Sequence, residues 1–172
     1  MEEKESFPSS VKRSLGTIGE FGELLVTTIL QKLEVHAFSV GRANYPYDII
    51  VPFKNPLFKR PAAIAVVTRK YQKKFFKDTP PRKEKFYKAR EALAKEGYDY
   101  WIAWVFYSFD EEKRKLGFKI YLIPAEIVTD DWFILHGKGS ESLQISNERV
   151  FSEARKKDSP IIVFSSDVMN EP

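Results

Sequence analysis

The chain carries one carboxylate at a position where it could help to bind a metal ion. Asp48 stands at the head of the apolar run IIV, which predicts a short β-strand, and a second predicted strand, AIAVVTRK, leads into a series of lysines. This arrangement would suit the frame of a metal-dependent nuclease, in which carboxylates supply the hard oxygen ligands that Mg²⁺ prefers. The frame also needs an acid on the second strand and, two residues further along the same face, a lysine. The chain has Ala65 and Val67 instead.

A helix and several strands would have to position these residues, and the sequence predicts both. Residues 16–33 carry apolar side chains at helical spacing, which indicates an amphipathic helix. Three strands are predicted after it, over residues 35–40, 47–51 and 63–70, and the third is apolar enough to be buried on both faces. The apolar stripe of the helix consists of Ile18, Phe21, Leu25 and Ile29.

A second helix is predicted to begin at Thr79, a good N-cap that precedes Pro80, and to end at Gly97, with its basic residues around the outer side. The resulting order of elements predicts an α/β fold with a central mixed β-sheet flanked by helices. Residues 1–13 are predicted to form a flexible N-terminal segment and residues 14–172 a single domain. Further strands are predicted over residues 98–107, 118–124, 142–146 and 159–164, with a short helix over residues 146–157.

Positive charge is concentrated in one segment of the chain. The net charge is +4, but residues 54–90 carry thirteen Lys and Arg against two acids, a local charge of +11, while the remainder carries −7. Such an excess attracts a polyanion, and the aromatic residues among these charges could stack on bases. A solvated surface with a short helix core is the ordinary alternative. The residues predicted to bind nucleic acid, DNA rather than RNA, are Arg42, Lys54, Lys59, Arg60, Arg69, Lys70, Lys73, Lys74, Lys77 and Arg82.

Short motifs give these features a more specific meaning. The run from Gly16 to Glu20 reads GTIGE, the run from Pro46 to Asp48 reads PYD, and the third strand contains AVVT. In order and spacing they resemble the PD-(D/E)xK, or restriction-endonuclease-like, superfamily, in particular its branch of small homing endonucleases and Holliday-junction resolvases. The resemblance covers residues 15–128 and implies a restriction-endonuclease-like fold.

The resemblance also implies a catalytic centre that has lost two of its usual residues. It places Glu20 and Asp48 on the superfamily's helix glutamate and strand aspartate, which bind Mg²⁺ in active members, close enough to share an ion or a water. Ala65 and Val67 replace the second acid and the lysine, and neither can bind a metal or move a proton. We therefore expect a nucleic-acid-binding protein with a degenerate centre and no cofactor.

Two other functions stay open. Lys70 or Arg69 could replace the missing lysine, with Glu23 as a second carboxylate, which would give an active Mg²⁺-dependent endonuclease. Alternatively, the fold is a non-catalytic scaffold for a protein partner in a DNA repair or replication complex, and a homodimer also stays open. In a purely structural reading, Glu20 is a first-turn acid that the helix dipole favours and Asp48 is a satisfied residue at the end of a strand.

The composition excludes several classes of protein. There is no cysteine, which rules out disulfides, thiolate zinc sites and cysteine nucleophiles, and the two separated histidines are too few for a histidine-rich metal site. No run approaches the roughly 18 apolar residues of a membrane helix, and the N-terminus lacks the apolar core of a signal peptide. We therefore expect a soluble, intracellular, cytoplasmic protein without a membrane partner, with the abundant Lys, Glu and Arg typical of thermophiles.

Overall fold

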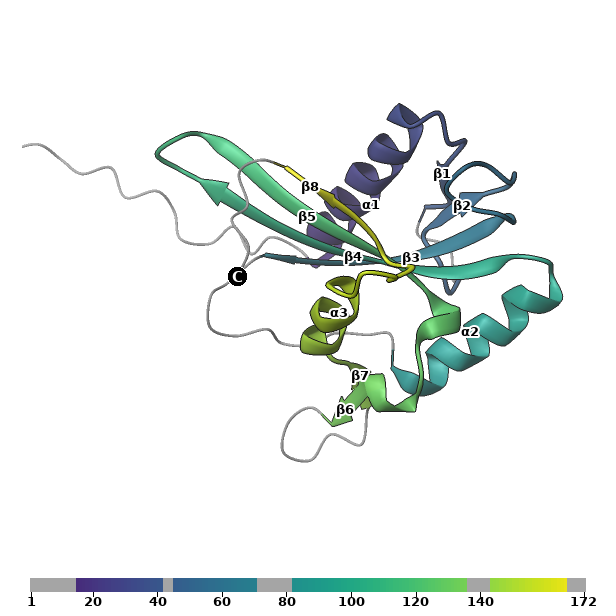
Figure 1. Ribbon diagram of the computed structural model, residues 1–172. Coiled ribbons are helices and arrows are strands. Elements are labelled where there is room, and N and C mark those ends of the chain that lie inside the picture. Colours follow the sequence, from purple (N-terminus) through teal and green to yellow (C-terminus); the bar gives the residue numbers. More distant parts are fainter. Residues whose placement is uncertain (1–14, 42–44, 71–81, 136–142, 167–172) are drawn as a thin grey trace, which may run out of the picture.

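The protein folds around a six-stranded mixed sheet with helices on both faces (Figure 1). The computed structural model describes residues 15–41, 45–70, 82–135 and 143–166. The strand order is β1-β2-β3-β4-β5-β8; β3 and β4 run parallel, and every other pair of neighbours is antiparallel. The prediction of an α/β fold with a mixed sheet flanked by helices is therefore confirmed. The strands are β1 Phe38–Ser39, β2 Ile49–Val51, β3 Ala62–Lys70, β4 Asp99–Asp110, β5 Lys115–Pro124 and β8 Ile162–Ser165.

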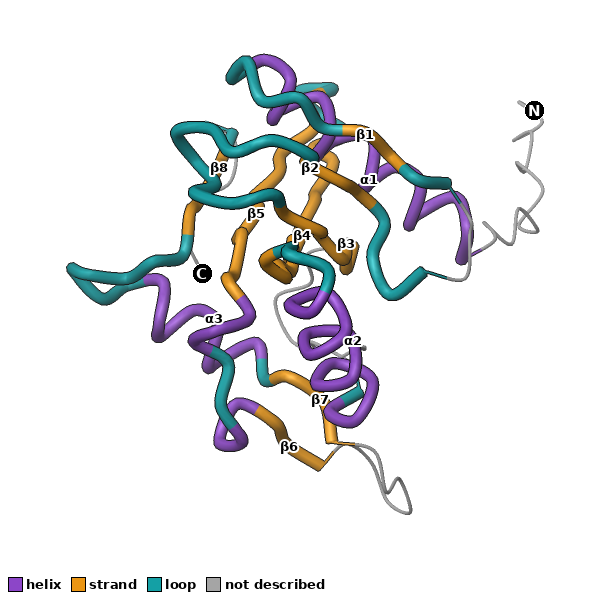
Figure 2. The backbone as a smooth tube through the Cα atoms, turned by 90° about the vertical axis from the view of Figure 1, so that its right-hand side faces the viewer, coloured by secondary structure: helices purple, strands orange, loops and turns teal. Residues whose placement is uncertain are grey.

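Three helices and a small second sheet cover the two faces. One face of the sheet lies under α1, and the other lies under α2, α3 and the β6–β7 pair (Figures 1 and 2). The crossover from β3 to the parallel strand β4 passes through α2, which fixes this helix against its own two strands. The bounds are α1 Leu15–Lys32, α2 Lys83–Lys95, α3 Asn147–Ala154, β6 Phe133–Leu135 and β7 Leu143–Ile145, with 3₁₀ turns η1 Ala125–Ile127 and η2 Asp130–Trp132.

The core under α1 is centred one residue away from the predicted stripe. Val26 and Leu30 are fully buried against the sheet, whereas Leu25 and Ile29 are only half-buried at the margin of this core. The four positions Leu25, Val26, Ile29 and Leu30 still follow the helical period, so the prediction of an amphipathic helix is confirmed. The centre moved because the helix packs its backbone, rather than its Phe21 side, closest to β3.

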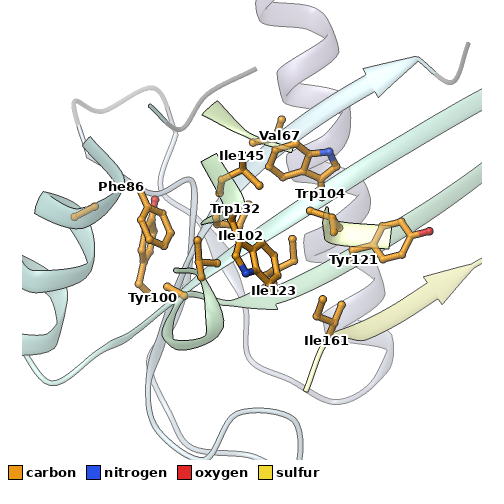
Figure 3. Packing of buried hydrophobic residues seen from close by; sticks show 14 of the residues in the cluster. Val67, Phe86, Tyr100, Ile102, Trp104, Tyr121, Ile123, Trp132, Ile145 and Ile161 are labelled. Carbon is orange, nitrogen blue, oxygen red and sulfur yellow. The ribbon is translucent and has the colours of Figure 1, made fainter. Parts of the chain in front are cut away.

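The core under α2 and α3 is rich in aromatic side chains (Figure 3). Phe86 of α2 is fully buried and lies 5.6 Å, between ring centroids, from Tyr100 of β4. Trp104 lies deeper in the same core, and its indole Nε1 donates to Asn147 Oδ1 at 2.7 Å. This bond ties the first residue of α3 to the centre of the sheet.

Two predicted boundaries are wrong, and each has a local cause. The helix α2 begins at Lys83, after Arg82 in an extended conformation; Thr79 and Pro80 lie outside the described residues. Its end at Gly97 is confirmed, since this glycine takes a φ of +86°. The first strand has two residues instead of six, because the backbone N–H of Val35 donates to Leu30 O at 3.0 Å and so completes the end of α1.

Candidate functional site

An open cleft of about 570 Å³ lies between β3 and α2. Its floor is the middle of β3, one wall is a face of α2, and the opposite wall is the segment that enters β2. The wall on α2 repeats at spacings of three and four residues, so its side chains share one helix face. The lining residues are Tyr45, Pro46, Asp48, Ala65, Val66, Val67, Lys85, Lys88, Ala89, Ala92 and Tyr100.

Asp48 is fixed at the edge of β3 by both its backbone and its side chain. Its backbone N–H donates to Ile64 O at 2.9 Å, and its carboxylate Oδ2 accepts the backbone N–H of Val66 at 2.7 Å. The carboxylate thus takes the place that a strand carbonyl would occupy in the ladder. Within the described part of the chain, Val66 supplies the one hydrogen bond to this carboxylate, so no described residue donates to Oδ1.

Burial controls the protonation of the two acidic groups in the cleft. Burial raises the pKa of the Asp48 carboxyl above its usual value, and the hydrogen bond from Val66 opposes this shift. Burial also raises the pKa of the Tyr100 hydroxyl, and the nearby negative charge of Asp48 adds to the effect. Tyr100 donates to Pro46 O at 3.2 Å. The phenol therefore stays protonated and holds the opposite wall in place.

Two lysines of α2, Lys85 and Lys88, line the same cleft as this carboxylate. Lys88 forms an exposed ion pair with Glu84 at 2.9 Å, one turn earlier on the same helix. Lys85 forms no ion pair with any described residue, and its side chain is exposed. The sequence reading placed these lysines on the outer side of the helix. Their spacing of three residues, shared with Ala89 and Ala92, was the signal that could have found them.

Aromatic surface is available at the mouth of the cleft. Tyr45 is 58% exposed and stacks on Tyr47, with 5.3 Å between ring centroids and an interplanar angle of 23°. A flat ligand could stack on the exposed ring of Tyr45.

The structure places the two predicted metal ligands on different elements. Asp48 lines the cleft, whereas Glu20 is exposed on α1, the helix that covers the opposite face of the sheet. Glu23, the alternative carboxylate, accepts a hydrogen bond from Ser39 of β1 at 3.3 Å. Among the residues that the structure describes, no three His, Cys, Asp or Glu side chains come together in a way that could hold a metal ion. A shared ion between Glu20 and Asp48 stays a prediction.

The two candidates for a displaced lysine lie on opposite faces of β3. Every residue of β3 pairs one-to-one with β4, up to Lys70 opposite Tyr107, so the strand has no bulge. Lys70 therefore points away from the face of Ala65 and Val67 and is exposed. Arg69 shares that face; it is half-buried, and its guanidinium donates to Thr68 O at 3.2 Å.

The described cations that were predicted to bind nucleic acid do not form one continuous surface. Lys54, Lys59 and Arg60 lie in the loop before β3, and Arg60 pairs with Asp99 at 3.1 Å. Arg69 and Lys70 end the same strand, and nine residues of strand span roughly 26 Å. Arg82 is the N-cap of α2, and Arg42, Lys73, Lys74 and Lys77 lie outside the described residues.

Arg90 has a structural position that the sequence did not indicate. Its guanidinium lies 4.6 Å from the centroid of the Tyr87 ring and donates to Ala125 O at 3.3 Å. It therefore joins α2 to η1 and is not available as a surface cation. Positive charge counted along a sequence overstates the charge that a ligand meets.

Comparison with known proteins adds no assignment. No model of a known protein family matches the chain, and no curated protein matches it. Within the described ranges, no helix is both long enough and apolar enough to span a membrane. The cleft and its residues are therefore the basis for a functional assignment.

Proposed function

We propose that this protein binds nucleic acid through the cleft between β3 and α2, and that it does not cleave it. The observation that carries this proposal is the pairing of two cationic side chains, Lys85 and Lys88, with a floor that lacks metal ligands, Ala65 and Val67. Cations on one helix face attract phosphates, and an exposed aromatic ring beside them can stack on a base. The cleft has both.

The order of elements supports a restriction-endonuclease-like core. A helix, three antiparallel strands, a crossover helix and a parallel strand follow one another, which agrees with the order that the resemblance implies. Asp48, just before β2, and Ala65 of β3 line the same cleft, and they are the two residues onto which the resemblance places the superfamily's acidic pair. In this reading the cleft is the remnant of a catalytic centre.

Chemistry argues against cleavage at this remnant. Metal-assisted hydrolysis of a phosphodiester needs charge held on the attacking and leaving oxygens. Ala65 cannot bind a metal and Val67 cannot hold a water, and losing one such contact commonly costs a factor of about 10²–10³ in rate. Lys70 points to the opposite face of β3 and cannot compensate.

Salt-dependent binding tests the first half of the proposal. Affinity for DNA and RNA, single-stranded and duplex, is measured over a range of salt concentrations. Each phosphate contact adds about −0.9 to the log–log slope on duplex DNA, so Lys85→Ala/Lys88→Ala should flatten the slope by up to about two. The matched control, Lys54→Ala/Lys59→Ala, removes equal charge at the far end of β3 and should change the slope less. Equal effects of the two double variants would contradict this location.

A cleavage assay tests the second half. We expect no cutting of duplex, junction or single-stranded substrates by the wild type with Mg²⁺ or Mn²⁺. Asp48→Ala, Lys70→Ala and Arg69→Ala are run beside it, because the active alternative needs Asp48 and one of the two cations. Metal-dependent cutting that disappears in Asp48→Ala would establish the endonuclease instead. A protein scaffold would show neither binding nor cutting.

A further inference from the structure

The cleft contains more than a phosphate backbone requires. Its volume of about 570 Å³ falls in the range of small-ligand pockets, about 300–1,000 Å³. Lysines alone would suffice to attract a phosphate, and a carboxylate in the same cleft repels one. Asp48 must therefore face a part of the ligand that is not anionic.

Asp48 is suited to accept a hydrogen bond from a base. The backbone N–H of Val66 donates to Oδ2 at 2.7 Å, and no described residue donates to Oδ1, so Oδ1 can accept a hydrogen bond from a ligand in the cleft that Asp48 lines. An ionised carboxylate can only accept hydrogen bonds. Cytosine and adenine present exocyclic amino groups that donate, whereas thymine and uracil present carbonyl oxygens at the same edge. The carboxylate should therefore discriminate between these two classes of base.

The remaining surfaces of the cleft suit the ring and the phosphate of the same nucleotide. Ala65 and Val67 give the floor short apolar side chains, and Tyr45 at the mouth offers a ring that is already stacked on Tyr47. Lys85, which pairs with no described acid, and Lys88 lie on the opposite wall. A base inside a duplex cannot reach such a cleft, because its edge is paired and its faces are stacked.

We propose that the cleft holds one unstacked nucleotide of a single strand, with its phosphate against Lys85 and Lys88 and an exocyclic amino group of its base donating to Asp48. This inference rests on the proposed nucleic-acid binding and adds its ligand class. The preferred ligands are single strands that contain cytosine, adenine or guanine, the bases that carry an exocyclic amino group. Thymine and uracil place a carbonyl oxygen against the carboxylate.

The test compares labelled oligonucleotides of dC, dA and dT, with CMP and UMP as competitors. We expect dC and dA to bind about tenfold more tightly than dT, the effect of one hydrogen bond to a charged group, and CMP to compete better than UMP. In Asp48→Asn the amide oxygen can accept the Val66 N–H, which turns its NH₂ group toward the ligand. The preference should then shift toward dT and UMP.

Three further variants separate the outcomes. Lys85→Ala/Lys88→Ala should lower the affinity for dC, dA and dT by the same factor, whereas Lys95→Ala on the same helix should not change the affinity for any of them. Ala65→Leu should fill the cleft and abolish competition by mononucleotides. Melting curves establish that each variant is folded. Tight polymer binding without base preference, unchanged in Asp48→Asn, would overturn this inference and leave the proposed function standing. Absence of binding to any nucleic acid would overturn both.

Discussion

At the scale of single residues, Asp48 combines a place on the cleft wall with a cost to the folded state. Its carboxylate is partly buried and receives one hydrogen bond from the described residues, from the backbone of Val66. Burial raises its pKa in the folded protein above the value of the unfolded chain.

This shift predicts a pH-dependent stability. Below the usual carboxyl pKa of 3.8 both states hold the proton and Asp48 costs nothing; as the pH rises, the unfolded state ionises first, and the penalty is complete above the raised folded pKa. The melting temperature of Asp48→Asn should therefore rise relative to that of the wild type from pH 4 upwards, and the difference between the two should become constant at higher pH.

Asp130 provides a control of opposite sign for this measurement. Hydrogen bonds from Tyr87 and Lys83 lower the pKa of its carboxyl, so the wild type gains stability as the pH rises through the acidic range. Asp130→Asn should therefore become less stable relative to the wild type as the pH rises over this range. Parallel pH profiles for the wild type and Asp48→Asn would refute the penalty.

Gly22 lets α1 pack closely against β3 because it has no side chain. A methyl group at Gly22 would overlap the hydroxyl of Thr68, whereas one at Gly19, also on α1, would meet no atom within 4 Å. Gly22→Ala should lower the free energy of unfolding by about 1–3 kcal/mol, and Gly19→Ala should raise it by up to about 1 kcal/mol. Chemical denaturation measures both, and Thr68→Ala should partly rescue Gly22→Ala. A stabilising Gly22→Ala would show that α1 does not approach β3 this closely.

At the scale of elements, α3 is attached to the sheet through its first residue. Asn147 is 5% exposed and accepts the indole N–H of Trp104 at 2.7 Å. Asn147→Leu keeps the volume but leaves that N–H unpaired in the core, which should cost about 1–3 kcal/mol. Urea denaturation measures the cost. Ser146→Ala, which removes only the N-cap of α3, should cost about 1 kcal/mol and serves as the comparison. Equal costs for an exposed substitution such as Ser152→Ala would contradict the role of Asn147.

The sequence predicts these elements well where their signals are local. The period of α1, the stop at Gly97 and the apolar run of β3, buried on both faces, depend on neighbouring residues, and each prediction agrees with the structure. The cleft could not be predicted in the same way. Lys85 lines the same cleft as Asp48 only because the crossover lays α2 over β3, and Arg90 turns inward only because it contacts Tyr87 and η1. Contacts between distant segments leave little trace in the spacing of residues.

At the scale of the whole molecule, β4 belongs to two cores at once. Its residues alternate between the faces: Trp104 packs under α2 and α3, and Val105 packs under α1. Neither core can lose this strand without exposing the other. The two layers should therefore unfold together, as expected of the single domain that the sequence predicts over residues 14–172.

The three tryptophans make this cooperativity measurable. Trp101 contacts Phe58 in the core under α1, with 5.1 Å between ring centroids, whereas Trp104 and Trp132 are buried in the other core. Variants that retain only Trp101 or only Trp132 should each show one transition in denaturant, with fluorescence and circular dichroism midpoints that coincide. Fluorescence and circular dichroism midpoints that differ within one variant would indicate layers that unfold independently.

The long β4–β5 hairpin also has a consequence for the order in which the chain folds. Its ten residue pairs are closed by the short turn Glu111–Arg114, whereas the partners in the β3–β4 pair are 37 residues apart. Because closing a longer loop costs more entropy, the hairpin should form in the folding nucleus and the parallel pair should dock later. Arg114 holds a φ of 50°, which a glycine adopts without strain. Arg114→Gly should therefore accelerate refolding in stopped-flow experiments, while Ala63→Gly in β3 should chiefly accelerate unfolding.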